Sequence, residues 1–286
     1  MTQDATRAKR FENAGAHAIL IAATIFALYP ILWVISLAFS SSAGVEASAI
    51  PWPTSPSLEH VEAVVTRTDD QERWLFVRQL INSLVVAICT SVAAIAIATP
   101  AAYAMSRFRF VGQKATMGAL LATQMFPGVA AAIPLYLILD ALGLIDTRSG
   151  LVLVYATSAV PFAIFQMRSA FDAIPRDLEE AAMVDGATRF GAFVRVVLPA
   201  ARPALAVTCL FAFMTAWNEF ILAATFLNRE ELFTLPVVLQ RYVGEYNAEW
   251  GRFAAGAILV SVPVMALFYW LQRHLVSGLN AGGVKG

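Results

Sequence analysis

A short polar segment with several carboxylates at helical spacing interrupts an otherwise apolar chain. It runs through Glu180, Ala181 and Ala182 to Asp185 and Gly186. Upstream of it, Pro175 suits the first turn of a helix, where the acidic residues that follow meet the positive end of the helix dipole. Glycine adopts the left-handed conformation that ends a helix, so we predict a short helix that stops at Gly186. This charged helix predicts a docking surface for a cytoplasmic partner.

A second short helix is predicted after the glycine. Its apolar face is formed by residues at i, i+3, i+4 and i+7, namely Phe190, Phe193, Val194 and Val197. Pro199 is expected to end or kink this helix. Two helices joined at Gly186 form a compact unit, residues 175–199, called the elbow below. The alternative is an amphipathic pair that lies on lipid headgroups, which the charged first half fits less well.

One further carboxylate stands apart, because Glu219 lies inside an apolar run that follows the elbow. A charged group in a membrane costs at least about 2.5 kcal/mol unless it is paired, hydrated or neutralised. Asn218 and Glu219 could therefore line a translocation pathway, where they would bind sugar hydroxyls or hold a gate. An inter-helix polar clasp is an equally weighted alternative.

The composition requires a membrane as the solvent. The chain of 286 residues is 59% hydrophobic and 14% charged, with a mean hydropathy of +0.67. A helix needs about 20 apolar residues to cross the hydrocarbon core. Six runs meet this need and predict an all-α, polytopic membrane protein with six transmembrane helices: His17–Phe39, Leu80–Met105, Ala115–Leu139, Ser149–Met167, Pro203–Leu227 and Phe253–Gln272.

The distribution of basic residues predicts the orientation. With the N-terminus inside, thirteen of the 20 Lys and Arg residues fall on the inner side and seven on the outer side. Both termini are then cytoplasmic. We predict a leader at 1–16, a permease domain at 17–274, a cytoplasmic tail at 275–286, external loops at 41–79 and 228–250, and a cytoplasmic loop at 168–202. The first span is too long for a cleaved signal and reads as an anchor.

The two cysteines carry no predicted chemistry. Cys89 and Cys209 each lie inside a predicted span, with no partner at metal-ligand spacing. We interpret both as packing residues in preference to a disulfide or redox pair. No metal site and no catalytic residue are predicted.

The elbow sequence resembles the EAA loop of ATP-binding cassette (ABC) import permeases. The similarity rests on Glu180-Ala181-Ala182, Gly186 and the hydrophobic-x-Leu-Pro ending at Pro199, and Trp217-Asn218-Glu219-Phe220 is similar to sugar permeases. The tail, residues 278–286, looks like that of the G-type (MalG-like) permease of maltose transporters. The resemblance implies that this loop transmits nucleotide-driven closure from an ATPase through Glu180, Ala181, Ala182, Asp185, Gly186, Arg189, Phe190 and Pro199.

The same resemblance implies a location for the tail. Similar tails insert between two ATPase subunits, which would place Gly282, Gly283, Val284, Lys285 and Gly286 at that interface. Physical chemistry alone favours a frayed terminus.

The resemblance also implies a set of partners. They are a second permease subunit (MalF-like), a homodimeric ABC ATPase and an external or periplasmic sugar-binding protein, in a bacterial or archaeal inner membrane. The chain has no G-x-x-x-x-G-K-[ST] phosphate cradle, so it is expected to be non-catalytic, with ATP and Mg on the partner subunits and no bound nucleic acid.

The implied function is ATP-driven uptake of a sugar, with maltose, maltodextrin or a related oligosaccharide as the expected cargo. Two alternatives stay open. One is a proton-coupled secondary transporter that uses Glu219, although six spans are few for the paired repeats of such carriers. The other is a membrane scaffold or sensor that transports nothing.

Overall fold

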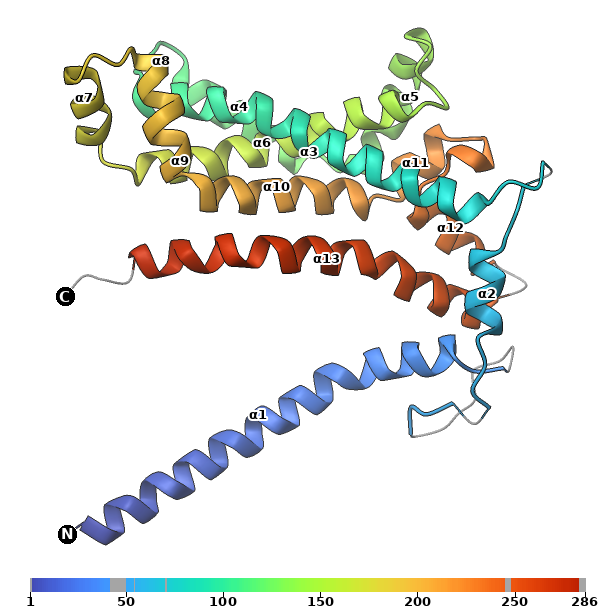
Figure 1. Ribbon diagram of the computed structural model, residues 1–286. Coiled ribbons are helices and arrows are strands. Elements are labelled where there is room, and N and C mark those ends of the chain that lie inside the picture. Colours follow the sequence, from blue (N-terminus) through green and yellow to red (C-terminus); the bar gives the residue numbers. More distant parts are fainter. Residues whose placement is uncertain (1, 42–49, 54, 70, 245–247, 283–286) are drawn as a thin grey trace. The chain divides into compact units, whose positions relative to one another are not determined.

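The computed structural model describes residues 2–41, 50–53, 55–69, 71–244 and 248–282 (Figure 1). These residues are almost entirely helical, with three isolated β-bridges. The helices are α1 (Thr2–Ala38), α2 (Glu59–Val65), α3 (Leu75–Arg107), α4 (Gln113–Met125), α5 (Ala132–Ala141), α6 (Arg148–Asp172), α7 (Asp177–Val184), α8 (Arg189–Ala192), α9 (Leu198–Ala200), α10 (Arg202–Trp217), α11 (Ile221–Phe226), α12 (Leu235–Arg241) and α13 (Trp250–Gly282).

The membrane spans match the predicted runs only in part. Within the described residues, α1, α3, α6 and α13 are long and apolar enough to cross a membrane as single helices, and two bent helix pairs bring the number of spans to as many as six. Helix α1 begins at Thr2, and the part of it that is apolar enough to cross a membrane is Gly15–Ala38.

Two of the predicted runs are not continuous helices. The run Ala115–Leu139 is divided into α4 and α5, whose axes differ by 93°. Pro127, which has no N–H to donate, lies at this break in an extended conformation. The run Pro203–Leu227 is divided into α10 and α11 by the segment Asn218–Phe220. A hydropathy window averages over such breaks and cannot detect them.

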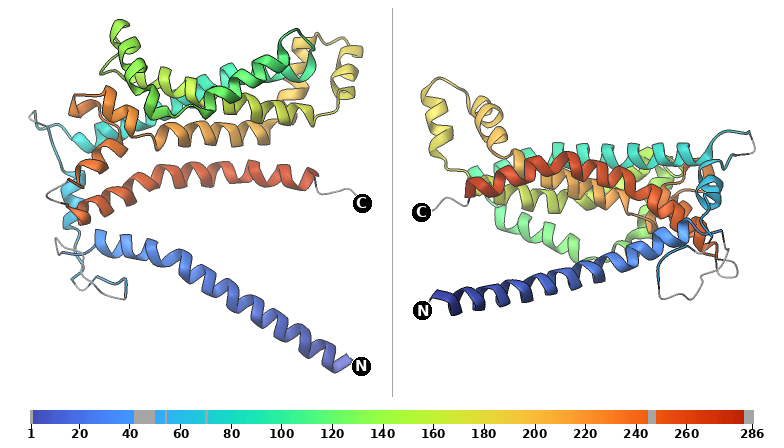
Figure 2. Two further views of the ribbon diagram at one scale, coloured as in Figure 1. Left: turned by 180° about the vertical axis from the view of Figure 1, so that it is seen from behind. Right: turned by 60° about the horizontal axis from the view of Figure 1, so that its bottom comes forward.

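The chain forms two compact units, each described by itself. The larger unit comprises Val77–Val238 together with the residues from Ser261 onward. In it α3, α6 and α10 run side by side, with α7 to α9 at one end and α5 and α11 at the other (Figures 1 and 2).

Small side chains let the helices of this unit approach closely. Ala94, Ala98 and Ala102 recur every fourth residue along α3 and are fully buried. Ala94 packs with Ala159 of α6 and Ala212 of α10. Membrane helices associate through van der Waals contact between such small residues, because lipid chains are as apolar as the helix surfaces.

A polar face at the start of α3 anchors the segment between α11 and α12. Asn82 donates from Nδ2 to the carbonyls of Glu231 (2.8 Å) and Phe233 (3.1 Å), and Gln79 donates to the carbonyl of Glu230 (3.1 Å). Ser83 Oγ accepts from the Leu235 N–H at 2.8 Å. These partly or fully buried hydrogen bonds give backbone groups of the segment side-chain partners on α3.

An ion pair fixes the loops at the same end of the unit. The Asp146 carboxylate accepts from the Arg229 guanidinium at 2.6 Å and from the Asn228 N–H at 3.0 Å. Burial raises the pKa of Asp146, but these hydrogen bonds and the charge of Arg229 outweigh burial and hold the pKa below its ordinary value. The loop after α5 and the loop after α11 are therefore held together at neutral pH.

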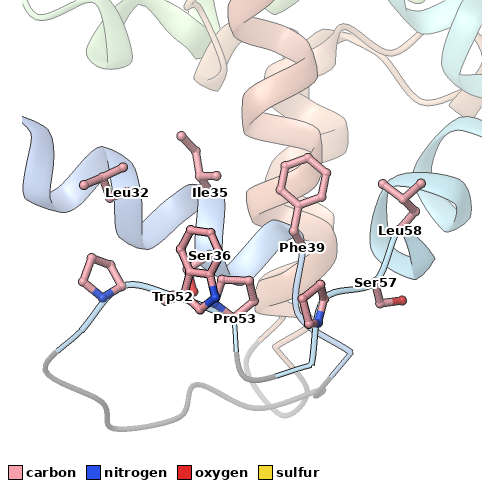
Figure 3. Close-up of a pocket in the computed structure, with 10 residues that line it drawn as sticks. Leu32, Ile35, Ser36, Phe39, Trp52, Pro53, Ser57 and Leu58 are labelled. Atoms are coloured by element: carbon pink, nitrogen blue, oxygen red, sulfur yellow. The ribbon is translucent and has the colours of Figure 1, made fainter.

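In the smaller unit, the segment after α1 folds back on the end of that helix. The Ser57 N–H donates to the Phe39 carbonyl (2.8 Å) and the Ser41 N–H to the Ser55 carbonyl (3.1 Å). They border an apolar pocket of about 480 Å³, in which Trp52 and Pro53 lie beside Ser36 (Figure 3). The prolines stiffen this return and limit its conformational freedom.

Candidate functional site

The first helix of the elbow ends where the sequence predicts. Helix α7 covers Asp177–Val184, and Gly186 has a φ of +90°. The Ala187 N–H donates back across this glycine to the Ala182 carbonyl at 3.0 Å, which pairs one of the last free carbonyls of the helix. The predicted stop at Gly186 is confirmed.

The second helix begins with a side-chain cap. Thr188 Oγ1 accepts from the Gly191 N–H at 3.1 Å at the start of α8, and a π-helical turn at Phe193–Val197 leads into α9. Pro199 lies within α9, and the helix ends one residue later at Ala200. It then turns by 76° into α10. The predicted end or kink near Pro199 is therefore found.

The predicted apolar face of this second helix is buried only in part. Phe193 and Val197 pack in a core with α3 and α6, whereas Phe190 is 74% and Val194 41% exposed. Helical periodicity identified one apolar stripe but not how much of it the chain itself covers. The uncovered half is available to a partner.

Most of the other predicted elbow residues also face outward. Ala182 and Pro199 are half-buried, and the remainder are exposed: Glu180, Ala181, Asp185, Gly186 and Arg189. The Arg189 guanidinium lies 5.1 Å above the ring of Phe108, a cation–π contact that orients it. The exposed residues of the elbow thus include carboxylates, an arginine and an aromatic ring.

The residues that hold the elbow in place were not predicted from the sequence. Glu179, buried beside exposed Glu180, accepts from the Tyr103 hydroxyl at 2.8 Å and forms an ion pair with Arg107. Arg107 also donates to the Ile174 carbonyl and to Ser106 Oγ, both at 3.0 Å. Tyr103 and Arg107 are four residues apart on α3, and this spacing at the end of a span was the available signal.

A second set of contacts ties the same end of α3 to α6 and the elbow. Ser106 Oγ donates to Asp172 at 2.5 Å, and the Arg176 guanidinium donates to the Ser106 carbonyl at 3.0 Å. Helix α7 is therefore fixed to α3 by directed polar contacts as well as by the apolar core. A movement of the elbow would be transmitted to α3.

The Glu219 carboxylate caps the start of α11. Its carboxylate accepts from the N–H groups of Leu222 (2.9 Å) and Ala223 (3.0 Å) at the start of α11, and from the Tyr155 hydroxyl of α6 (2.6 Å). These contacts are those of an inter-helix clasp, the second of the two roles considered from the sequence. Asn218 is exposed at the end of α10.

This geometry predicts different results for two substitutions of Glu219. Glu219→Gln keeps one oxygen for the helix start but loses the other acceptor, at a cost of about 0.5–1.5 kcal/mol of stability. It should still retain ATP-dependent uptake, because no proton transfer through this residue is needed. Glu219→Ala leaves the buried Tyr155 hydroxyl unpaired and should destabilise the protein by about 1–3 kcal/mol. Uptake by membrane vesicles and the amount of folded protein would be measured for both. Loss of uptake in a well-folded Glu219→Gln variant would instead favour the proton relay.

The tail prediction falls largely outside the described residues. Gly282 is the last residue of α13, and Gly283, Val284, Lys285 and Gly286 are not among the residues that the structure describes. No group of three or more His, Cys, Asp or Glu residues that could hold a metal ion occurs within the described ranges.

A set of apolar helices long enough to cross a membrane defines an integral membrane protein. A match to the family described as "Binding-protein-dependent transport system inner membrane component" covers residues 74–280. The chain belongs to this family. It is an integral inner-membrane, non-catalytic subunit of an ABC transporter, which confirms the class that the elbow sequence predicted.

Several relatives are similar over nearly the whole chain. The trehalose transport system permease protein SugB of Mycobacterium tuberculosis is 36% identical over 263 residues, covering 91% of this chain and 93% of that protein. The maltose/maltodextrin transport system permease protein MalG of Vibrio vulnificus is 35% identical, with 95% of each chain covered.

A solved structure agrees with the fold. A bacterial ABC transporter involved in the import of the acidic polysaccharide alginate contains a chain that is 26% identical, with a TM-score of 0.76 over 93% of this chain and 97% of that chain. A chain of the methionine transporter MetNI, 17% identical with a TM-score of 0.59, shares the fold.

Proposed function

We propose that this chain forms half of the membrane pathway of an importer that takes up an oligosaccharide, with maltose, maltodextrin or a related sugar as the cargo. The observation that carries this proposal is the set of relatives that match nearly the full chain. They are named for trehalose, diacetylchitobiose, galactooligosaccharides and maltodextrin, at 33–36% identity. A further relative, 36% identical over 91% of this chain, is named for sulfoquinovosyl glycerol. All five names are carbohydrates or glycosides, and the proposal of a neutral oligosaccharide follows the first four.

The elbow is the proposed docking site for an ATPase subunit. Its exposed face combines the carboxylates of Glu180 and Asp185 with the guanidinium of Arg189 and the ring of Phe190. Aromatic residues and arginine are enriched in protein interfaces, and the rims of such interfaces are polar. Ala181, Ala182, Gly186 and Pro199 shape the backbone of this face, and Gly282 to Gly286 would approach the same partner.

The proposed assembly contains this chain, a second permease subunit, two ATPase subunits that bind ATP and Mg, and an external sugar-binding protein. Both termini and the elbow face the cytoplasm, in agreement with the excess of Lys and Arg on that side. The loops near Asp146 and Arg229 then face outward, since they lie at the opposite end of the larger unit (Figure 1).

ATP can drive transport only if the ATPase contacts the permease differently in its two conformational states. A ligand shifts a conformational equilibrium by its difference in affinity for the two states, so the ATPase must bind the elbow differently in the inward-facing and outward-facing states. The contacts of Glu179 with Tyr103 and Arg107 would carry that difference to α3.

The test is purification of the tagged chain in mild detergent, identification of the subunits that copurify, and reconstitution into liposomes. ATP hydrolysis should rise when a binding protein loaded with trehalose or maltose is added. Hydrolysis by an associated ATPase that no sugar-loaded binding protein stimulates would contradict the sugar assignment. Absence of any associated ATPase would contradict the whole proposal.

A further inference from the structure

A cleft of about 810 Å³ lies in the larger unit, between the broken span and α6. It is lined by α3, α4, α5 and α6 and by the break itself, through Phe126 and Gly128. None of the described residues that line it carries a charge. Its polar lining consists of Thr123, Gln124, Thr157 and Ser158.

The break places non-helical backbone within the depth of the membrane. Helix α4 starts beside Lys114 and has 13 residues, so Phe126 lies roughly 20 Å further along its axis. Phe126 and Pro127 are extended there, and Phe126 is 60% exposed. Non-helical backbone at such depth is stable only where protein buries it or where it lines a water-filled cavity.

The polar side chains that line the cleft are not buried by other parts of the chain. Gln124, Thr157 and Ser158 are all exposed in the chain. The amide of Gln124 is unfavourable toward lipid, because its carbonyl oxygen would lack a hydrogen-bond partner there. Gln124 therefore faces protein or water, and Thr157 and Ser158 line the same cleft.

Their internal hydrogen bonds leave acceptors free toward the cleft. The hydroxyls of Thr157 and Ser158 donate to the Val154 carbonyl at 2.7 and 3.2 Å, and Gln124 Nε2 donates to the Ser158 carbonyl at 3.2 Å. A hydroxyl proton that is used in this way leaves lone pairs on the oxygen, and the Gln124 amide keeps its carbonyl oxygen. A ligand that suits this surface is neutral and rich in hydroxyl donors.

We propose that this cleft is the part of the sugar pathway that this chain contributes, and this inference rests on the proposed function. Sugar hydroxyls would donate to Gln124 on α4 and to Thr157 and Ser158 on α6, while Phe126 offers an apolar ring beside them. This assignment moves the pathway away from Asn218 and Glu219, which do not line the cleft. The competing occupant is the second permease subunit, which would make the cleft a dry interface.

The test is the accessibility of single cysteines in the complete transporter in membrane vesicles. Cys89 and Cys209 are first replaced by alanine, and Gln124→Cys, Thr157→Cys and Ser158→Cys are introduced one at a time. The matched control is Val92→Cys on α3, which is 61% exposed but does not line the cleft. The probe is the charged, membrane-impermeant reagent MTSES, which reacts with a hydrated thiolate.

We expect the cleft cysteines to react at least about tenfold faster than the control cysteine, because thiolates form only where water enters. Trehalose or maltose supplied with its binding protein and ATP should slow the reaction. If the variants retain ATP-driven uptake but their cysteines react no faster than the control, the cleft is dry and the inference is wrong, while the proposed function stands. If uptake of any sugar is absent in the unmodified complex, the proposed function fails, and a fast reaction then marks a pathway for another solute.

Discussion

Replacement of Gly186 with valine is expected to abolish uptake and to lower the stimulation of ATP hydrolysis by the loaded binding protein about 5-fold to 150-fold, the range of typical coupling free energies. Gly186 has a φ of +90°, and no heavy atom lies within 4 Å of the position of an added Cβ. The effect therefore comes from the backbone, since a β-branched residue adopts this conformation only with strain. Relief of the strain would turn α7 relative to α8.

The matched control for this variant is Gly143→Val. Gly143 also has a positive φ, +66°, and open space around an added Cβ, but it lies between α5 and α6, at the end of the larger unit away from the elbow. Both variants should reach the membrane in normal amounts, since the strain costs only about 1–2 kcal/mol. Equal loss of coupling in both variants, or normal uptake with Gly186→Val, would contradict the role of the elbow.

Charge reversal at Glu180 tests the same surface without strain. Glu180 is exposed on α7, so Glu180→Lys should leave the fold intact while it removes a carboxylate from the docking face. We expect uptake to be lost and the basal ATPase rate to be uncoupled from the binding protein. Measurements of uptake and of hydrolysis on the same preparation would separate uncoupling from failure of assembly.

Features with a local physical cause could be predicted from the sequence. The end of α7 at Gly186 depends on one residue's conformational freedom, and the apolar runs that became α3, α6 and α13 depend on composition. The break between α4 and α5 depends instead on how Pro127 and the surrounding helices are accommodated. No window average contains that information.

The contacts of the elbow with α3 were equally out of reach. Glu179 and Glu180 are chemically identical neighbours, yet one is buried and the other exposed. What separates them is the position of Tyr103 and Arg107, more than 70 residues earlier in the chain. Sequence spacing could suggest a helix face for each of these residues but could not pair the faces.

The second large effect is expected at this buried pair. The side chains of Arg107 and Glu179 are only 6% and 8% exposed. Glu179→Leu leaves the Arg107 charge buried with only neutral partners, which typically destabilises a protein by about 3–5 kcal/mol. We expect a lower melting temperature of the detergent-solubilised complex and less protein in the membrane. The matching change at an exposed pair, Glu249→Leu beside Arg252, should cost less than about 1 kcal/mol.

The double variant Arg107→Met with Glu179→Leu separates stability from coupling. Apolar residues of similar volume can replace a buried ion pair without loss of stability, so the double variant should melt at a higher temperature than either single variant. Apolar packing, however, does not fix the direction of α7 as the hydrogen bonds of Glu179 to Tyr103 and Arg107 do. Stimulation of ATP hydrolysis should therefore stay low in the double variant although its stability returns. Recovery of both quantities would show that the pair only stabilises the fold and that apolar packing alone links the elbow to α3.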